Sequence, residues 1–463
     1  MAEPAAAASD PGNTAFLMLS TALVLLMTAP GLALFYCGMV RSKNALTTLM
    51  HVFATVCMVC LIWLVYGYSL AYTNGGGVNA WLGGFSKIFL GGVTTTSEVA
   101  TFSNGVTVPE YAYVCFQMTF AAITPALIVG AFAERMRFSA MLAFMALWVT
   151  FVYIPIAHMV WYWPGPDAIA TAAAAVRDAV GADKIAAQAV LDATLADAGL
   201  IFRWGAIDFA GGTVVHISAG VAGLIAALTI GPRFGYGREP MQPHSLPLCM
   251  IGASLLWVGW FGFNCGSNLE ANGTAALAMV NTFGAAAAAG LSWMFTEWMV
   301  RGRPTILGVL TGVVAGLVAV TPASGYAGPM GAIVLGLSAG VICLFFCTTI
   351  RNLFGYDDSL DVFGVHCVAG IVGALATGVL VNPDFGGTGV LDYVSKPGEA
   401  VVTYDMAAQV TAQAKAVGLT LLWSGAGSAV ILAIVHLAFG LRSPIDDEFD
   451  GLDISEHGER AYT

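Results

Sequence analysis

The chain has 463 residues, with 17 basic and 28 acidic side chains that give it a net charge of −11. Only 10% of the residues are charged and 58% are hydrophobic, whereas a soluble domain carries about 25% charged residues. This composition leaves too little polar surface for a water-soluble globule of this size. It therefore argues against a soluble enzyme, a disordered chain and a nucleic-acid-binding protein. The remaining class is a polytopic membrane protein.

Apolar stretches of the length that a bilayer-spanning helix needs, about 20 residues, recur along the whole chain. The sequence predicts an all-α fold with eleven transmembrane helices. They are expected near residues 15–37, 46–72, 110–133, 138–163, 207–230, 246–268, 275–299, 304–321, 328–350, 361–381 and 411–440.

The distribution of basic residues predicts the orientation of these helices. Of the 17 basic residues, eleven fall in alternate loops or in the C-terminal tail, on one side of the predicted bundle. Because lysine and arginine favour cytoplasmic loops, the N-terminus is predicted outside and the C-terminus in the cytoplasm. The eleven residues are Arg41, Lys43, Arg135, Arg137, Arg233, Arg238, Arg301, Arg303, Arg351, Arg442 and Arg460.

Four segments are too polar to lie in the bilayer. Residues 1–14 carry no basic stretch ahead of the first apolar run, so they are not predicted to be a signal peptide. An outside N-terminus is then expected either from a signal peptide already removed or from translocation of the N-terminal tail. The Ala-rich excursion 165–205 is predicted to be an outer surface helix or hairpin, and 382–410 a second outer loop. The acidic tail 443–463 is predicted to be solvated and disordered.

No pattern in the sequence predicts a cofactor or a bound metal. The nine cysteines lie in or beside apolar stretches, which argues against a disulfide framework. Cys57 and Cys60 have CxxC spacing but no second ligand pair, so packing is favoured over a metal site. No Walker motif or dinucleotide-binding fingerprint follows a strand. Glycines four residues apart, at 308–316 and 336–340, predict close contacts between helices.

Two histidines inside apolar spans are the first functional candidates. His216 lies in the fifth predicted span and His366 in the tenth, and each follows an acidic residue and a glycine. Units of five helices must insert in opposite orientations, so the sequence predicts two inverted repeats, 15–230 and 246–381, followed by an eleventh helix at 411–440. Inverted repeats commonly enclose a transport site near the bilayer midplane. Buried imidazoles are mostly neutral, and a neutral pair suits proton-coupled chemistry.

Aromatic residues cluster in the third, fourth and sixth spans. Phe116 and Phe120 share one helix face, while Trp161, Trp260 and Phe263 lie near the ends of their spans. Such rings form either an interfacial belt or, with a hydroxyl nearby, a cage for a small cation. Spacing alone leaves both interpretations open.

Longer strings resemble the ammonium transporters of the Amt/Mep/Rh family, and more closely the bacterial Amt branch. The matching strings are FQMTFAAITPALIVGAFAERMRF (116–138), DFAGGTVVHI (208–217), SLLWVGWFGFNCGS (254–267), DDSLDVFGVHCVAGIVGA (357–374) and the tail GLDISEHGERAY (451–462). The resemblance covers nearly the whole chain; the excursion 165–205 is longer than in compact members.

The resemblance implies specific roles. Phe116, Phe120, Trp161 and Ser267 would form an outer ammonium recruitment site, with Asp208 nearby. Phe120 and Phe263 would form a gate, and His216, His366, Trp260 and Tyr36 would line the pore or its surroundings. The role of Asp208 stays open between organising hydrogen bonds, assisting deprotonation and attracting the cation.

The resemblance also implies an ammonium transporter of the inner (plasma) membrane that works without catalysing a reaction. It implies a homotrimer with one pore per subunit, and a PII-type signal protein at the cytoplasmic face and tail. Membrane lipid is expected around the bundle, and nucleic acid is not expected as a partner. Three alternatives remain: an ammonium sensor with little flux, a sodium-coupled carrier with Asp208 as ion ligand, and a gas channel.

Overall fold

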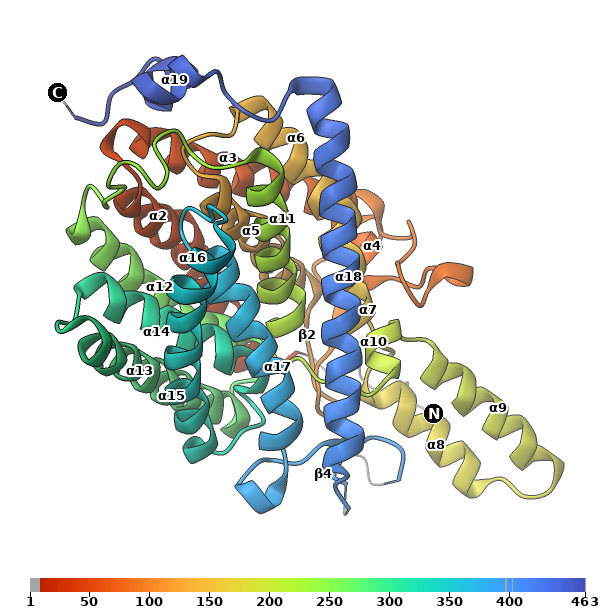
Figure 1. Cartoon of the computed structure of the whole chain (residues 1–463). Helices are drawn as coiled ribbons and strands as arrows, with labels where there is room; N and C mark the ends of the chain where they lie inside the picture. Colours follow the sequence, from red (N-terminus) through yellow and green to blue (C-terminus); the bar gives the residue numbers. More distant parts are fainter. Residues whose placement is uncertain (1–8, 396–397, 402, 463) are drawn as a thin grey trace.

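The computed structural model describes residues 9–395, 398–401 and 403–462, and this part of the chain is almost entirely helical (Figure 1). It contains 11 helical segments long and apolar enough to cross a membrane. The first half contributes α1 (Pro11–Leu26), η1 (Met27–Leu32), α2 (Ala33–Met39), η2 (Ser42–Asn44), α3 (Ala45–Ile62), η3 (Trp63–Gly67), α4 (Tyr68–Tyr72), α5 (Glu110–Phe132), α6 (Phe138–Trp148), η6 (Val149–Tyr153), α7 (Ile154–Trp161), η7 (Gly212–Ile217) and α11 (Ser218–Ile230).

The second half contributes the remaining spans. These are α12 (Leu246–Gly266), α13 (Gly273–Arg301), α14 (Ile306–Val320), η8 (Thr321–Ala323), α15 (Pro329–Phe345), η9 (Phe346–Ile350), α16 (Arg351–Phe354), η10 (Phe363–Cys367), α17 (Val368–Leu380) and α18 (Met406–Phe439). All eleven predicted spans are confirmed, with ends that differ by up to five residues.

Smaller elements lie at the ends of the bundle. The excursion forms a helical hairpin, α8 (Pro166–Asp178) and α9 (Ala182–Ala196), followed by α10 (Leu200–Arg203), in agreement with the prediction. Strands β1 (Glu98–Ala100) and β2 (Thr107–Pro109) pair antiparallel with Val99 opposite Val108. Strands β3 (Leu391–Asp392) and β4 (Glu399–Ala400) pair with Asp392 opposite Glu399. Single 3-10 turns occupy η4 (Gly76–Val78), η5 (Ile88–Leu90) and η11 (Pro383–Phe385).

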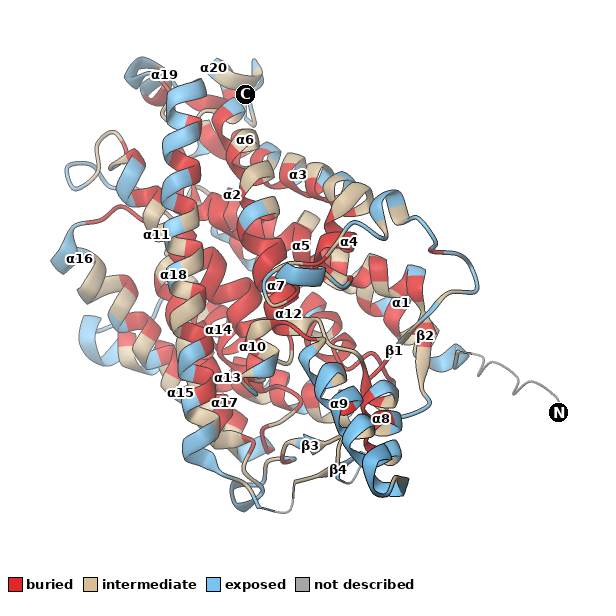
Figure 2. Cartoon of the chain, turned by 90° about the vertical axis from the view of Figure 1, so that its right-hand side faces the viewer, coloured by how far each residue is buried: buried red, intermediate tan, exposed pale blue. Residues whose placement is uncertain are grey.

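The helix α5 lies at the centre of the bundle and α18 at its edge. In the most apolar stretch of each helix, 89% of the α5 residues are buried but only 33% of the α18 residues. Figure 2 shows the same contrast, with α5 mostly red and α18 exposed along one side. The exposed apolar side of α18 is the surface expected of a helix that faces lipid or another membrane protein.

Glycines allow three helices of the second half to approach closely. A Cβ on Gly316 of α14 would lie 2.4 Å from the carbonyl oxygen of Ala285 on α13, and one on Gly336 of α15 would lie 2.3 Å from the same oxygen. Real Cβ atoms do not tolerate such distances, so both positions require glycine. This agrees with the small-residue packing predicted from the four-residue glycine spacing.

The fifth and tenth spans run in opposite directions. The end of α11 lies beside the start of the tenth span, because Arg233 forms an ion pair with Asp357 at 2.8 Å. At the other end of the molecule the excursion contacts the loop that follows α17, since Arg177 donates a hydrogen bond to the Val394 carbonyl at 3.0 Å. An antiparallel pair at these positions is the arrangement that inverted halves require.

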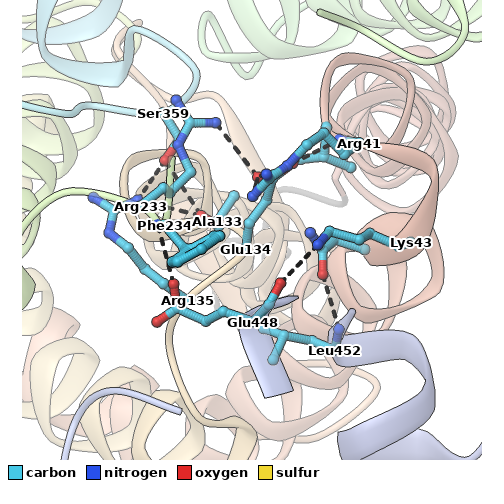
Figure 3. A network of polar contacts seen from close by, with 12 residues as sticks. Arg41, Lys43, Ala133, Glu134, Arg135, Arg233, Phe234, Ser359, Glu448 and Leu452 are labelled. Atoms are coloured by element: carbon cyan, nitrogen blue, oxygen red, sulfur yellow. Dashed lines mark hydrogen bonds and ion pairs between the residues drawn. The ribbon is translucent and has the colours of Figure 1, made fainter. Parts of the chain in front are cut away.

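A network of buried charges connects loops at the end that carries the basic residues (Figure 3). Glu134 contacts Arg41 at 2.6 Å and Arg233 at 3.7 Å. Burial alone would raise the pKa of the Asp357 carboxyl, but the hydrogen bonds and charge of Arg233 hold that pKa below its usual range. Buried ions need such partners because an unpaired charge in a low dielectric is very costly.

The acidic tail is ordered and packs on the bundle, so the prediction of a solvated tail is wrong for residues 443–462. The tail forms α19 (Ile445–Asp450) and α20 (Leu452–His457). The fully buried Glu448 pairs with Arg442 at 2.5 Å. Lys43 donates to the Glu448 carbonyl at 2.8 Å (Figure 3). Asp453 accepts hydrogen bonds from the backbone at the start of α3, including 2.7 Å from the Thr47 amide.

Candidate functional site within the helix bundle

The two intramembrane histidines meet at the centre of the bundle. His216 belongs to the π-helical turn η7 and His366 to the π-helical turn η10, each at the start of its span. The rings stack with centroids 5.4 Å apart and planes 13° apart. Their Nδ1 atoms are 3.3 Å apart, and one must donate while the other accepts. Both side chains are buried, at 0% and 5% exposed, so the pair shares one N–H between two neutral rings.

Each histidine turn is capped by an aspartate eight residues earlier. The Asp208 carboxylate accepts hydrogen bonds from the amides of Gly211, Gly212, Thr213 and Val214, at 2.6 to 3.2 Å, and from the Thr213 hydroxyl. Asp358 accepts a bond of 2.7 Å from the Phe363 amide. These contacts satisfy amide groups that have no partner within the first turn of a helix.

The acidic residue nearest before His366 in the sequence is Asp361, but it does not cap this turn. Asp361 points away from this role, because its carboxylate forms an ion pair with Arg351 at 2.5 Å. Asp358 was missed as a functional candidate. The spacing from Asp208 to His216 equals that from Asp358 to His366, so the signal was present in the sequence.

Aromatic rings extend from the histidine pair toward the outer side. Trp260 stacks on His216 at 5.4 Å, and its indole N–H donates to the Thr321 hydroxyl at 3.0 Å. Phe263 lies 5.9 Å from His216 and stacks on Phe120 with centroids 4.2 Å apart. The pair Phe120 and Phe263 therefore separates the histidines from the outer side.

Below this phenylalanine pair the free space is small and apolar. A cavity of about 10 Å³ touches Tyr36, Trp260 and both histidines, roughly the volume that one water molecule needs. The Tyr36 hydroxyl donates to the Leu127 carbonyl at 2.9 Å, so its proton faces away from the ring pair. The remaining lining residues are Leu32, Phe35, Ile123, Leu127, Leu256 and Val314.

Above the phenylalanine pair lies a much wider outer vestibule of about 480 Å³. Phe120, Trp161, Ser267 and Asp208 all line it. The Trp161 indole N–H donates to the Asp208 carbonyl at 3.0 Å, which fixes the indole edge-on to Phe120 at 5.8 Å. The Ser267 hydroxyl donates to the Phe263 carbonyl at 2.8 Å, which leaves its oxygen lone pairs available as acceptors.

Phe116, one of the predicted site residues, does not reach the vestibule. Phe116 is fully buried and is not among the residues that line the vestibule. Its ring packs edge-on against Phe120, with centroids 5.0 Å apart. Its contribution is therefore to hold the Phe120 ring in place from behind, and it offers no face to the vestibule.

Gln117 is a further lining residue that the residue-by-residue assignment missed. Its side chain is 9% exposed and lines the vestibule, and its buried Oε1 atom has no hydrogen-bond partner in the part of the chain that the structure describes. A buried acceptor without a partner is rare and costly. The available signal was a polar amide between Phe116 and Phe120 in an otherwise apolar span. In the described part of the chain, no group of three or more His, Cys, Asp or Glu residues is arranged to hold a metal ion.

Comparison of the chain with known proteins shows the family to which it belongs. The chain matches the Ammonium Transporter Family over residues 15–462. It is 42% identical over 453 residues to an ammonium transporter of Aquifex aeolicus, covering 98% of this chain and 94% of that protein. It is 40% identical over 451 residues to one of Bacillus subtilis, covering 97% and 98%.

Solved structures agree in fold. Mep2 of Candida albicans has 30% sequence identity and a TM-score of 0.76, and the match covers 95% of this chain and 88% of that one. A protein described as a sensor Amt protein has a TM-score of 0.78 at 24% identity, covering 96% and 98%, and supports the fold alone. The chain is a multi-pass membrane transporter of ammonium and not an enzyme, and it belongs to the ammonium transporter family.

Proposed function

We propose that ammonium is held in the outer vestibule by Phe120, Trp161 and Ser267, loses its proton at the Phe120–Phe263 pair and crosses the membrane as ammonia beside His216 and His366. The continuous contact from Trp161 through Phe120 and Phe263 to His216 is the observation that supports this route. The Trp161 and Phe120 rings offer cation–π contacts, and Ser267 offers a lone pair to an N–H. Phe116 supports the Phe120 ring, and Trp260 and Tyr36 line the path near the histidines.

The narrow cavity is the reason for deprotonation. An unpaired ion in an apolar space of about 10 Å³ has no room for a hydration shell, and its transfer from water costs many kcal/mol. Ammonium avoids this cost by releasing a proton, whereas potassium has no proton to release. The route therefore selects ammonium over an ion of similar size.

Asp208 acts by positioning. Its carboxylate oxygens are already occupied by four backbone amides and one hydroxyl, and its carbonyl accepts the Trp161 indole N–H. This arrangement favours the organising role over deprotonation and over sodium binding. Oxygen atoms that already accept this many hydrogen bonds are poor additional ligands for a sodium ion, so the sodium-coupled carrier is not favoured.

The proton that ammonium releases has two exits. It returns to the outside, which makes transport electroneutral, or it passes separately through the hydrogen-bonded imidazole pair, which carries current. The shared N–H between Nδ1 atoms provides the contact that the second exit needs.

Further elements of the proposal concern the assembly. Segments 15–230 and 246–381 are the two inverted halves, with 411–440 as the additional helix. The chain forms a homotrimer in the plasma membrane with the N-terminal segment 1–14 outside, although residues 1–8 lie outside the described part. A PII-type signal protein binds the cytoplasmic face beside the docked tail.

The test is ammonium-triggered current across proteoliposomes that contain the purified protein, with potassium and sodium pulses as controls. Current for ammonium alone is expected if the proton crosses through the histidine pair. If no current appears, an internal pH dye should report alkalinisation of the lumen by ammonia. Absence of both signals would refute the conduction route and favour the sensor.

A further inference from the structure

The outer vestibule is far larger than the capture of ammonium requires. Its volume of about 480 Å³ falls within the range of small-molecule binding pockets, roughly 300 to 1,000 Å³. Phe120 and Trp161 form only the part of its wall nearest the histidines. The rest comes from the excursion and from the outer loops, and includes Ile169 of α8 and Leu195 of α9.

An aromatic wall, formed by Phe102, Trp163, Phe202 and Tyr393, lines this additional space. Trp163 stacks on Phe202 at 5.4 Å and on Phe102 at 6.0 Å, with planes 26° and 14° apart. Tyr393 completes the wall, 5.2 Å from Trp163, and its hydroxyl donates to the Phe102 carbonyl at 3.2 Å. The four residues come from segments far apart in the sequence, so their tertiary arrangement brings the rings to one place.

Carboxylates accompany the aromatic wall. Glu270 is 7% exposed and accepts hydrogen bonds from the Ser103 amide and hydroxyl and from the Asn272 side chain. These donors are neutral, so they hold the carboxylate in place without cancelling its charge. Asp208 also lines the vestibule, and the described residues that line it include no lysine, arginine or histidine. Aromatic rings attract cations, and so does the charge of a carboxylate such as Glu270 that has only neutral hydrogen-bond donors beside it.

The buried Oε1 atom of Gln117 indicates a ligand with a hydrogen to donate. Gln117 lines the same cavity and is more than nine-tenths buried, and its Oε1 atom has no hydrogen-bond partner among the described residues. An N–H or O–H group of a bound molecule would satisfy it. Cavity size, aromatic wall, charge and acceptor thus converge on one chemical class.

We propose that the outer vestibule binds a small organic ammonium ion, with its alkylated nitrogen against the aromatic wall and its polar hydrogen toward Gln117. Alkyl groups spread the charge and reduce the cost of leaving water, which suits an aromatic surface. Such an ion is too large for the cavity of about 10 Å³ between the histidines. It therefore stays in the vestibule and obstructs the path of ammonium to Phe120. The binding step is independent of the proposed conduction route, whereas the obstruction rests on it.

Choline is the probe, and 3,3-dimethylbutan-1-ol is its neutral counterpart with carbon in place of the charged nitrogen. Titration calorimetry of the full-length protein in detergent measures both, so the result does not depend on flux. Choline should bind, and the alcohol should bind at least about tenfold more weakly. Choline should also slow ammonium entry into proteoliposomes without itself entering them.

Variants separate this site from nonspecific binding. Trp163→Ala and Glu270→Gln should each weaken choline binding by about tenfold, since each removes one attraction for the cation. Ile185→Ala is the matched control, because Ile185 is 76% exposed on α9 and does not line the vestibule; it should leave binding unchanged. The proposal is overturned if the alcohol binds as tightly as choline, or if choline binding is unchanged in both vestibule variants. Choline that binds without slowing ammonium entry would overturn the obstruction.

Discussion

Replacement of Asp208 tests whether this carboxylate acts by positioning the histidine turn. Its oxygens accept hydrogen bonds from four successive backbone amides, at 2.6 to 3.2 Å, and from the Thr213 hydroxyl. Asp208→Ala removes all of these acceptors at once. The amides then lie at the start of η7 with water from the vestibule as their only new partner. The turn that carries His216 loses the constraint that aligns it with His366.

The expected loss can be estimated from these contacts. Loss of an N-cap side chain costs about 1 kcal/mol, and a hydrogen bond to a charged group contributes about 1.5 to 3 kcal/mol. Because the contributions are not additive and the vestibule admits water, we expect Asp208→Ala to cost about 3 kcal/mol of stability. Asp208→Asn keeps one acceptor oxygen and should lose about half as much. Thr213→Val removes only the hydroxyl contact and should lose the least.

The assay combines thermal unfolding in detergent with ammonium flux in proteoliposomes, measured at several pH values. A positioning role predicts a graded loss in both measurements, with Ala most affected, then Asn, then Val. It also predicts that the pH dependence of the remaining flux stays as in the parent protein. A proton acceptor would behave differently, because Asn would abolish flux as completely as Ala. An Asn variant with unchanged unfolding temperature and no flux would refute the positioning role.

Three further predictions concern other parts of the molecule. Replacement of His216 by Asp or His366 by Glu should change the ratio of ammonium to potassium flux, and an unchanged ratio in both variants would contradict the proposed selectivity. Burial and a neighbouring carboxylate raise the pKa of Asp358 from 3.8 to about 7. The protonated Asp358 therefore stabilises the folded state fully below about pH 4, and this stabilisation is lost as the pH rises through about 7. The loss in free energy of unfolding is up to about 4 kcal/mol. Asp358→Asn should flatten this decline in unfolding temperature between about pH 4 and 7. A decline as steep as the parent's would show that another group causes it. Gly336→Ala should cost about 1 to 3 kcal/mol because its Cβ meets a backbone carbonyl, whereas Gly418→Ala, with open space around it, should be nearly neutral; equal unfolding temperatures would contradict the packing argument.

The helices were predictable because length and hydropathy alone determine which segments can cross a bilayer, but their ends were not. Helix α18 begins at Met406, five residues before the predicted start, because Asp405 caps it with a bond of 3.0 Å to the Ala408 amide. Gln413 then lies inside the bundle and donates to the carbonyls of Ile207 and Ala374. Polar side chains that find partners in the fold extend a helix beyond its apolar stretch, and hydropathy does not record those partners.

The docked tail could not be predicted for a related reason. Its composition is acidic, and acidic segments without partners remain solvated. Two of the tail's partners lie far away in the sequence, since Glu448 contacts Lys43 through its carbonyl and Asp453 caps the start of α3. The acidic composition of the tail is therefore real, but whether the tail is ordered depends on tertiary contacts with residues near the other end of the chain.

The two aspartates that cap the histidine turns, Asp208 and Asp358, lie in different surroundings although the two turns have the same spacing from aspartate to histidine. Both histidines lie in π-helical turns at the start of their spans and stack with planes 13° apart, while the Trp260 and Phe263 rings pack against His216. Asp208 lines the wide outer vestibule and has both oxygens hydrogen-bonded. Asp358 is 1% exposed and lies beside the buried charge network, and one of its oxygens has no hydrogen-bond partner among the residues that the structure describes. The pKa of Asp358 is raised to about 7, so this carboxyl group is partly protonated near neutral pH. The Asp208 carboxylate instead accepts hydrogen bonds from four backbone amides and one hydroxyl. The two ends of the path therefore differ in their capping aspartates even though both histidines lie in π-helical turns capped at the same spacing.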